Sequence, residues 1–286
     1  MTTWRELERQ ARQRLGDLQE ARWLVQQAAG RTGAEWLADL DETAPDRCVP
    51  YVEQMLERRV AGEPLQYVLG RWGFRRLDLA IDRRVLIPRP ETEQVVEHAI
   101  TELTRLRLLT GKPPRVVDLG TGSGAIALSL AVEVAGAEVW ATDASDGALA
   151  VARANLVGVG GMAATRVRIV GGRWYDALPP ELAGRVDMVV SNPPYLARSE
   201  LDDLDPAVAR WEPTAALVAG ATGLEAVEEV VEGARRWLRE PGAVVVELAP
   251  VQAEAAVAVA LGAGFTRAEV RPDLSGRARA LVASIG

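Results

Sequence analysis

An apolar run at residues 186–191 ends in Asn192-Pro193-Pro194-Tyr195. Such a run predicts a buried strand, and because proline cannot extend a sheet ladder, the tetrapeptide should form a stiff loop at the strand's carboxyl end. Ligands of open α/β sheets bind at that edge. The Asn192 side chain and the Pro193 carbonyl can both accept hydrogen bonds from a planar NH2 group, and the Tyr195 ring can cover that group. The motif predicts a site for an amide or amino nitrogen, although a proline turn that only caps a strand would have the same sequence.

A second junction lies at residues 116–124, where an apolar strand runs into Gly120, Gly122 and Gly124 and then an apolar helical stretch. Alternating glycines let a backbone approach a nucleoside closely, because no Cβ intervenes. The same spacing fits the relaxed dinucleotide fingerprint, so this motif alone leaves a hydride-transfer enzyme open. Asp143 follows the next strand, where an acid would accept hydrogen bonds from both ribose hydroxyls, and it would serve either cofactor.

The glycine loop, Asp143 and the NPPY loop together resemble the S-adenosylmethionine-dependent methyltransferases that methylate planar nitrogen. Dehydrogenases have no use for the NPPY loop. Further segments narrow the resemblance, namely residues 62–70 (GEPLQYVLG), residues 85–93 (VLIPRPETE) and Glu212-Pro213. They look like the HemK/PrmC family, the peptide chain release factor glutamine methyltransferases. The likeness runs from about residue 60 to the C-terminus.

The resemblance implies a role for each matching residue. The residues expected to bind S-adenosyl-L-methionine are Gly120, Thr121, Gly122, Ser123, Gly124, Asp143, Trp174 and Asn192. Those expected to bind the substrate amide are Asn192, Pro193, Pro194 and Tyr195. Among them Asn192 would orient the amide, Pro193 would accept through its backbone and Tyr195 would pack over the amide plane, so these three are the expected catalytic residues.

Some positions depart from the family's pattern or allow a second interpretation. Arg173 stands before Trp174 where an acid is common, Ala249 stands where a glycine usually follows Glu247-Leu248, and Ala278 replaces a usual acid. Trp174 could pack on the adenine or could simply be a core residue. Residues 88–92 (PRPET) could close over the cofactor or could be a stiff linker.

From residue 115 onward strands and helices alternate, which predicts a mostly parallel sheet covered on both faces. We expect strands at residues 115–119, 137–142, 166–171, 186–191, 243–248, 265–270 and 279–284. We expect helices at about residues 124–135, 145–157, 225–239 and 251–262. The fold class is therefore α/β, and the resemblance makes it a Rossmann-like class I methyltransferase with a seven-stranded sheet whose last strand is reversed.

The first part of the chain has apolar residues at helical spacing, which predicts a small helical bundle over residues 1–69. Thr32-Gly33-Ala34-Glu35 predicts a capping box at the start of one of its helices. Alternating apolar residues then predict a β-hairpin linker at residues 70–90, followed by a catalytic domain at residues 91–286. Because the bundle has no residues suited to chemistry, we expect it to recognise the substrate.

The net charge of −7 and the sequence pI of 5.1 bear on the substrate. They argue against a large phosphate-binding surface, since nucleic-acid affinity comes mainly from Lys and Arg. DNA methyltransferases with NPPY-type loops usually need a basic cleft to hold the strand. The balance favours a protein amide and predicts no direct nucleic-acid binding. A local basic patch remains open at Arg71, Arg75, Arg76, Arg83 and Arg84.

A single cysteine, Cys48, excludes an internal disulfide, and a single histidine, His98, offers no cluster for a transition metal, so no metal site is expected. No apolar stretch reaches the roughly 18 residues that a membrane span needs. The first residues also lack the apolar region of a signal peptide. We therefore expect a cytoplasmic enzyme without a membrane partner, and a monomer, although the sequence does not give the oligomeric state.

The expected function is methyl transfer from S-adenosyl-L-methionine to the side-chain amide nitrogen of the glutamine in the Gly-Gly-Gln motif of peptide chain release factors, which modulates translation termination. Two other substrates remain open, an amino group in nucleic acid and a glutamine in a ribosomal protein. A catalytically dead binding module is a third possibility, but the intact glycine loop and NPPY loop weigh against it.

Overall fold

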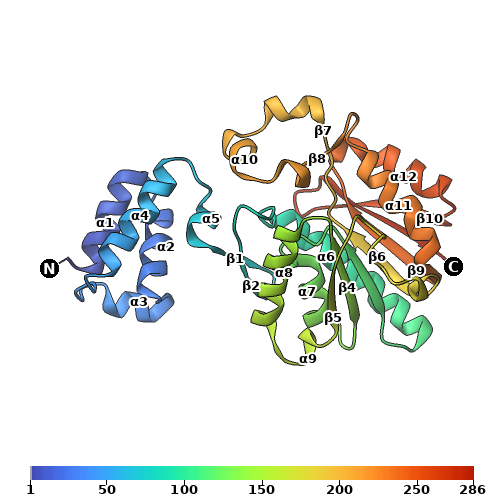
Figure 1. The fold of residues 1–286 in the computed structure, drawn as a ribbon, viewed down its shortest axis with the longest axis horizontal. Helices are drawn as coiled ribbons and strands as arrows, with labels where there is room; N and C mark the ends of the chain where they lie inside the picture. Colours follow the sequence, from blue (N-terminus) through green and yellow to red (C-terminus); the bar gives the residue numbers. More distant parts are fainter. Residues whose placement is uncertain (1) are drawn as a thin grey trace. The chain divides into compact units, whose positions relative to one another are not determined.

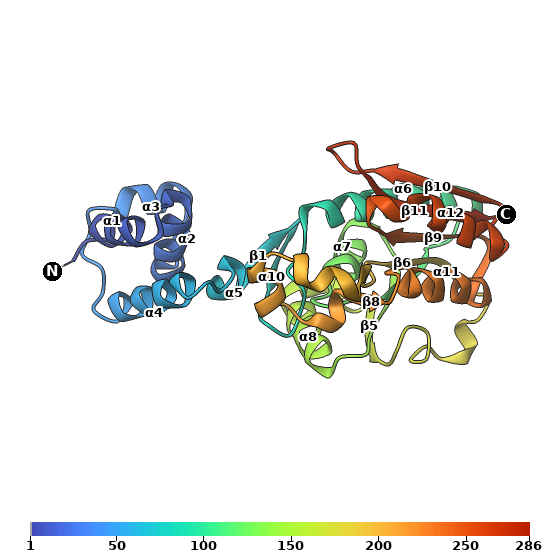
Figure 2. The same ribbon diagram turned by 90° about the horizontal axis from the view of Figure 1, so that it is seen from above.

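The computed structural model describes residues 2–286 of the chain. It has two compact units, which divide between Arg71 and Trp72 (Figure 1). The first is mainly helical, and the second contains all the strands of a seven-stranded sheet (Figure 2).

The first unit is built from helices α1 (Trp4–Leu15), α2 (Leu18–Ala29), α3 (Gly33–Asp39), α4 (Cys48–Val60) and α5 (Leu65–Leu69). The apolar faces of α1, α2 and α4 meet in one core, in which the Trp4 and Trp36 rings pack edge to face with centroids 6.1 Å apart. The predicted bundle is confirmed. The capping box at Thr32 is wrong, because Thr32 precedes α3 but its side chain makes no capping hydrogen bond.

Strands β1 (Arg71–Phe74) and β2 (Leu77–Ala80) form a two-stranded sheet at the predicted hairpin. The end of β2 is held by Asn155, whose Oδ1 accepts from the Ala80 N–H at 2.7 Å. The Asn155 amide also donates to the carbonyls of Ala80 at 3.1 Å and Ser123 at 2.8 Å. The hairpin is thereby tied to the glycine loop.

The large sheet has the strand order β10-β11-β9-β6-β3-β4-β5. Its strands are β3 (Arg115–Leu119), β4 (Glu138–Asp143), β5 (Val167–Gly171), β6 (Val186–Ser191), β9 (Leu238–Glu247), β10 (Arg267–Pro272) and β11 (Ala278–Ile285). Strand β11 is antiparallel to both of its neighbours, whereas the β9, β6, β3, β4 and β5 strands pair in parallel. The predicted sheet with its reversed last strand is therefore confirmed.

The central strands are buried on both faces, so they read as continuous apolar runs. Val117 and Val189 belong to a core shared with helices α11 (Glu225–Trp237) and α12 (Ala253–Gly262). Side chains alternate along a strand, so Val116 and Val190 point to the opposite face. There helices α6 (Pro90–Thr110) and α7 (Ala125–Glu133) pack on β6 and β3. Helices α8 (Asp146–Val159) and α9 (Gly161–Ala164) follow β4.

Several elements were not predicted from the sequence. Helix α6 is the longest of them, and a group of short ones lies between the NPPY loop and α11. They are β7 (Leu196–Ala197), η2 (Arg198–Asp203), α10 (Pro206–Trp211), η3 (Thr214–Ala216) and β8 (Val218–Gly220), with β7 parallel to β8. Two further short turns are η1 (Pro180–Leu182) and η4 (Pro250–Gln252).

Candidate active site

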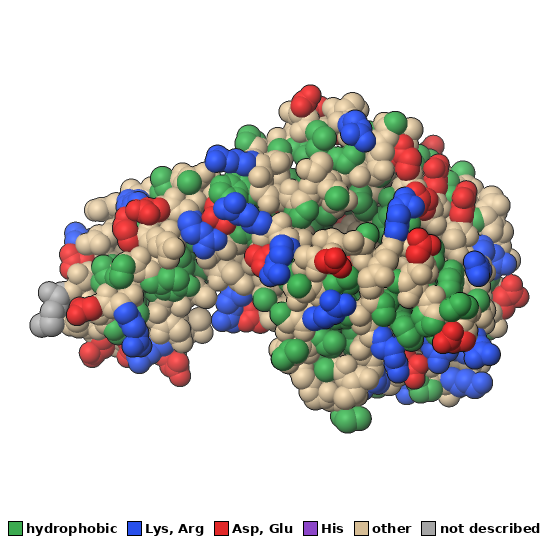
Figure 3. All heavy atoms as spheres, viewed as in Figure 1, with side chains coloured by type: hydrophobic (Ala, Val, Ile, Leu, Met, Phe, Trp, Pro, Cys, Tyr) green, Lys and Arg blue, Asp and Glu red, His purple; other side chains and the backbone are tan. Residues whose placement is uncertain are grey.

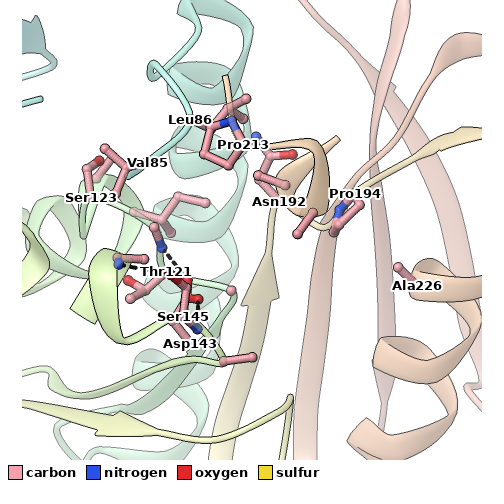
Figure 4. Close-up of a pocket in the computed structure, with 18 of the residues that line it drawn as sticks. Val85, Leu86, Thr121, Ser123, Asp143, Ser145, Asn192, Pro194, Pro213 and Ala226 are labelled. Atoms are coloured by element: carbon pink, nitrogen blue, oxygen red, sulfur yellow. Dashed lines mark hydrogen bonds between the residues drawn. The ribbon is translucent and has the colours of Figure 1, made fainter. Parts of the chain in front are cut away.

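A cavity of about 490 Å³ opens at the carboxyl ends of β3, β4 and β6 (Figure 4). Its floor is formed by residues at or just after the ends of these strands, among them Thr121, Asp143 and Asn192. Residues from the segment before α6 and from the segment after α10, including Leu86 and Pro213, complete its wall. This volume is in the range of small-molecule sites.

Hydrogen bonds to Asp118, whose side chain is fully buried, fix the glycine loop. One carboxylate oxygen, Oδ2, accepts from the Thr121 hydroxyl at 2.6 Å and from the Ala127 N–H at 3.1 Å. Burial raises the pKa of the Asp118 carboxyl to about 7. The sequence motif contained Asp118, but nothing in it indicated that this acid closes the loop onto the first turn of α7.

Asp143, the acid predicted to bind the ribose, is the last residue of β4 and lines the cavity. Its two carboxylate oxygens accept from the backbone, Oδ2 from the Gly122 N–H and Oδ1 from the Ser145 N–H, each at 2.9 Å. A carboxylate has about four lone-pair positions, so two bonds leave acceptor capacity toward the cavity. Gly122 has a φ of 56°, and a Cβ there would meet no atom within 4 Å, so its glycine is required by backbone conformation and the cavity side stays open.

The other predicted members of the glycine loop differ in position. Gly120, Thr121 and Ser123 line the cavity with Gly122, whereas Gly124 does not. Gly124 stands at the start of α7, where a Cβ would lie 3.0 Å from the Leu128 side chain, so it permits close helix packing.

Trp174 lines the cavity and also packs against the apolar core. A Cβ on Gly120 would lie 3.4 Å from the Trp174 ring. The Trp174 backbone carbonyl accepts from the Thr142 hydroxyl at 3.0 Å. The preceding Arg173 donates to Glu229 at 2.6 Å. The basic residue found in place of the usual acid is therefore paired at the cavity wall.

The four NPPY residues are not equivalent. Asn192 and Pro194 line the cavity, Pro193 is buried beside it, and Tyr195 is not among the lining residues. Burial raises the pKa of the Tyr195 hydroxyl to about 12, so this group is neutral at physiological pH and cannot serve as a general base.

The side chain of Asn192 belongs to a buried chain of hydrogen bonds that the sequence did not indicate. Its Nδ2 donates to the Thr92 hydroxyl at 3.2 Å, and that hydroxyl donates to Glu247 Oε2 at 2.7 Å. Thr92 and Glu247 are 3% and 1% exposed, respectively. Burial raises the pKa of the Glu247 carboxyl to about 7.

Two family motifs that are far apart in the sequence meet at the rim. The buried Glu212 accepts from the Arg89 guanidinium at 2.5 Å and from the Ile87 N–H at 3.3 Å. Pro88 and Pro213, which adjoin these residues, both line the cavity. The PRPET segment is thus anchored to the wall of the cavity.

The arginines of the expected basic patch are largely engaged. Arg75 is paired with Glu97 and Glu133, Arg84 with Asp82, and the Arg83 guanidinium lies 4.0 Å from the centroid of the Trp211 ring. Figure 3 shows basic and acidic side chains interspersed on the visible face.

The departures at Ala249 and Ala278 lie away from the lining residues of the cavity. Ala249 donates its N–H to Gln252 Oε1 at 3.0 Å, and Ala278 begins β11. In the part of the chain that is described, no group of three or more His, Cys, Asp or Glu side chains could hold a metal ion. None of the helices from residue 2 to residue 286 is long and apolar enough to cross a membrane.

Comparison with known proteins agrees with this geometry. The Methyltransferase small domain matches residues 101–207, and the PrmC N-terminal domain matches residues 6–70. The release factor glutamine methyltransferase of Bordetella pertussis is 44% identical over 259 residues, which cover 90% of this chain and 91% of that protein. This chain belongs to the release factor glutamine methyltransferase family.

A second member of this family, from Cereibacter sphaeroides, is 36% identical over 93% of this chain and 90% of its own length. Among solved structures, the hMettl16 catalytic domain in complex with the MAT2A 3′UTR hairpin 6 aligns with a TM-score of 0.54 and 16% identity, covering 84% of this chain and 81% of that one. At that identity the likeness concerns the fold alone. The family models, the relatives and the fold together show an S-adenosylmethionine-dependent methyltransferase.

Proposed function

We propose that this chain transfers a methyl group from S-adenosyl-L-methionine to the side-chain amide nitrogen of the Gly-Gly-Gln glutamine of peptide chain release factors, and that it thereby modulates translation termination. The observation that carries the proposal is that Asp143 and Asn192 line one cavity, which joins a ribose-binding acid to an amide-binding loop (Figure 4). Membership of the family supports the same substrate.

The residues present fit the cofactor. Asp143 is fixed by two backbone N–H groups and would accept from the ribose hydroxyls, while Gly120, Thr121, Gly122 and Ser123 would pass the methionine part. Trp174 would border the adenine. The cofactor supplies an electrophilic methyl group on a sulfonium centre, so the protein's task is to align the accepting nitrogen with it.

An amide nitrogen is a poor nucleophile because its lone pair is delocalised into the carbonyl. Asn192 Oδ1 and the Pro193 carbonyl would accept from the substrate NH2 and place negative partial charge where positive charge develops, which favours the transition state over the ground state. Pro194 would border the bound side chain. Tyr195 would pack over the amide plane, and its neutral hydroxyl takes no proton.

We also propose that the helical unit, residues 1–69, recognises the protein substrate. It presents exposed apolar side chains, with Leu37 63% exposed, Tyr51 41% and Val60 58%. A glutamine in a loop offers few contacts, so selecting one protein requires a second surface. Residues 70–90 would then be the hairpin linker and residues 91–286 the catalytic domain. We place the enzyme in the cytoplasm, where release factors act, as a monomer that binds no nucleic acid directly.

Labelled S-adenosylmethionine tests the proposal. Purified release factor should take up methyl groups, and the same protein with the Gly-Gly-Gln glutamine replaced by alanine should take up none. Ribosomal proteins and RNA serve as competing substrates in parallel reactions. Transfer to either of them in preference to release factor would reassign the substrate while leaving the methyltransferase itself intact.

A further inference from the structure

We infer that Thr92 is a positioning residue for methyl transfer, because it fixes which end of the Asn192 amide faces the substrate. This inference rests on the proposed function, since it concerns how the same site holds an amide. It assigns a role to a hydroxyl at the start of α6, in a segment that the sequence suggested only as a lid or a linker.

The direction of each hydrogen bond follows from the number of protons. A threonine hydroxyl has one proton, and Glu247 can only accept while its carboxyl is ionised, the form that its pKa of about 7 leaves at and above neutral pH. The Thr92 hydroxyl gives its proton to Glu247 Oε2 at 2.7 Å. It can therefore only accept from Asn192, at 3.2 Å, and the atom that Asn192 presents to it must be the NH2 group.

The consequence concerns the other end of the Asn192 amide. With Nδ2 committed to Thr92, Oδ1 is the atom left for a ligand in the cavity that Asn192 lines. An accepting oxygen matches a substrate NH2. If the amide were turned over, its NH2 would face the substrate NH2 and its oxygen would face a hydroxyl whose proton is already used, so both contacts would be mismatched.

Burial makes this orientation strict. Thr92 and Glu247 are 3% and 1% exposed, so water does not offer either of them an alternative partner. Their backbones are also well fixed, because Thr92 lies in the first turn of α6 and Glu247 is the last residue of β9. Groups in a rigid helix and a central strand hold Asn192 more firmly than its own loop would.

The test compares Thr92→Val, which removes the hydroxyl at nearly constant shape, with Thr92→Ser, which keeps it. Thr92→Val should lower kcat on release factor by about tenfold or more while cofactor affinity stays within about threefold, since the bond acts on the amide acceptor. Thr92→Ser should regain most of that rate. Thr104→Val is the matched control, because Thr104 lies on the same helix but its exposed hydroxyl only bonds the Ile100 carbonyl at 2.8 Å.

A double-mutant cycle with Asn192→Ala separates positioning from a general effect on the fold. If Thr92 acts through Asn192, adding Thr92→Val to Asn192→Ala should lower kcat by less than about twofold further, because coupled residues are not additive. Full additivity, an unimpaired Thr92→Val, or a Thr92→Ser variant as slow as Thr92→Val would each overturn the inference. Should Thr92→Val not fold by circular dichroism, Thr92→Ala takes its place in the same cycle.

The wild-type rate on release factor tests the proposed function. The ratios of the kcat values of the Thr92 and Asn192 variants to that of the wild type test the role of Thr92, on whichever amide substrate the wild type methylates. A wrong substrate and a wrong role for Thr92 would therefore give different results.

Discussion

Gln252 donates from Nε2 to the carbonyl oxygen of Tyr195 at 2.9 Å. The same nitrogen donates to the Gly223 carbonyl at 2.9 Å, and Gln252 Oε1 accepts from the Ala249 N–H. A Cβ on Gly223 would lie 2.7 Å from the Tyr195 carbonyl oxygen, so the loop ending in Tyr195 and the segment before α11 are in direct contact. One buried amide thus fixes the far end of the NPPY loop.

Replacing Gln252 by glutamate should therefore disorder this loop. A carboxylate cannot donate, so the Tyr195 and Gly223 carbonyls would both lose a partner, and an unsatisfied buried acceptor costs roughly 1–3 kcal/mol. We expect lower stability in urea and a lower kcat. The exposed Gln13→Glu substitution is the control for the added charge. Unchanged stability and turnover in Gln252→Glu would show that the loop is held by other contacts.

Asp143 governs cofactor affinity. Asp143→Ala should weaken S-adenosylmethionine binding by roughly 1–3 kcal/mol, because a ribose hydroxyl loses its charged acceptor and two backbone donors lose theirs. Isothermal titration calorimetry measures the change, and Asp146→Ala, at the first residue of α8, is the control. A titration of the wild type with NAD belongs in the same experiment. Tight binding of NAD with none of S-adenosylmethionine would refute the cofactor assignment.

Asn192 should affect turnover far more than cofactor binding. Asn192→Ala should lower kcat by about a hundredfold or more, since loss of one preorganised partner of the reacting group costs a few kcal/mol. Cofactor affinity should stay within about tenfold, because one lining residue among many is lost. Steady-state kinetics on release factor, with calorimetry of the cofactor, separates the two effects. A loss confined to cofactor affinity would contradict the role given to Asn192.

The two buried carboxyls predict how stability depends on pH. Burial raises the pKa of Asp118 from 3.8 to about 7 and that of Glu247 from 4.5 to about 7. Both groups bind a proton more tightly in the folded chain, so their contribution to stability is complete below the unfolded pKa and is lost as pH rises toward 7. Between the unfolded and the folded pKa of each carboxyl, the free energy of unfolding should fall by roughly 1.4 kcal/mol per pH unit for that group.

Urea unfolding at a series of pH values tests this expectation. The acids Glu225 and Asp273 have a pKa lowered to about 2 by hydrogen bonds, so between about pH 5 and 7 they stay ionised in both states and add no slope. Asp118→Asn removes one titrating group and should flatten the profile in that window. A wild-type profile that is already flat there would mean that neither carboxyl is protonated in the folded chain.

The sequence predicted the sheet well because its signals are local. Strands β3 and β6 have the bounds expected from their apolar runs, each of which ends in a glycine or proline motif. The bounds of helix α6 were not predicted, because Pro88 and Pro90 suggested a rigid junction. In the structure Pro90 begins the helix, a position where its missing N–H costs nothing. The prolines do mark a boundary in the chain, but that boundary is the start of helix α6.

The site was only partly predictable for a different reason. Asp143 and Asn192 follow strands directly, so their position at the carboxyl edge could be inferred from the pattern. Thr92 and Glu247 are 155 positions apart and meet only after α6 packs on β9. Glu212 reaches Ile87 across 125 positions in the same way. No local periodicity encodes such pairs, and a buried acid at a strand end is the one signal that could have drawn attention to Glu247.

The role proposed for the helical unit can be tested by removing it. A chain that begins at Trp72 keeps what remains of the hairpin, which Asn155 ties to the glycine loop through Ala80 and Ser123. A chain beginning near Arg84 would cut those bonds. The chain that begins at Trp72 should retain cofactor affinity within about tenfold, because all lining residues of the cavity lie between Arg84 and Glu229. Its kcat/KM on intact release factor should fall steeply, because the second contact surface is gone.

Circular dichroism and cofactor titration confirm that the truncated chain is folded, and a short peptide containing Gly-Gly-Gln should be methylated equally by both proteins. If the truncated enzyme modifies intact release factor with unchanged kinetics, the helical unit only stabilises the protein.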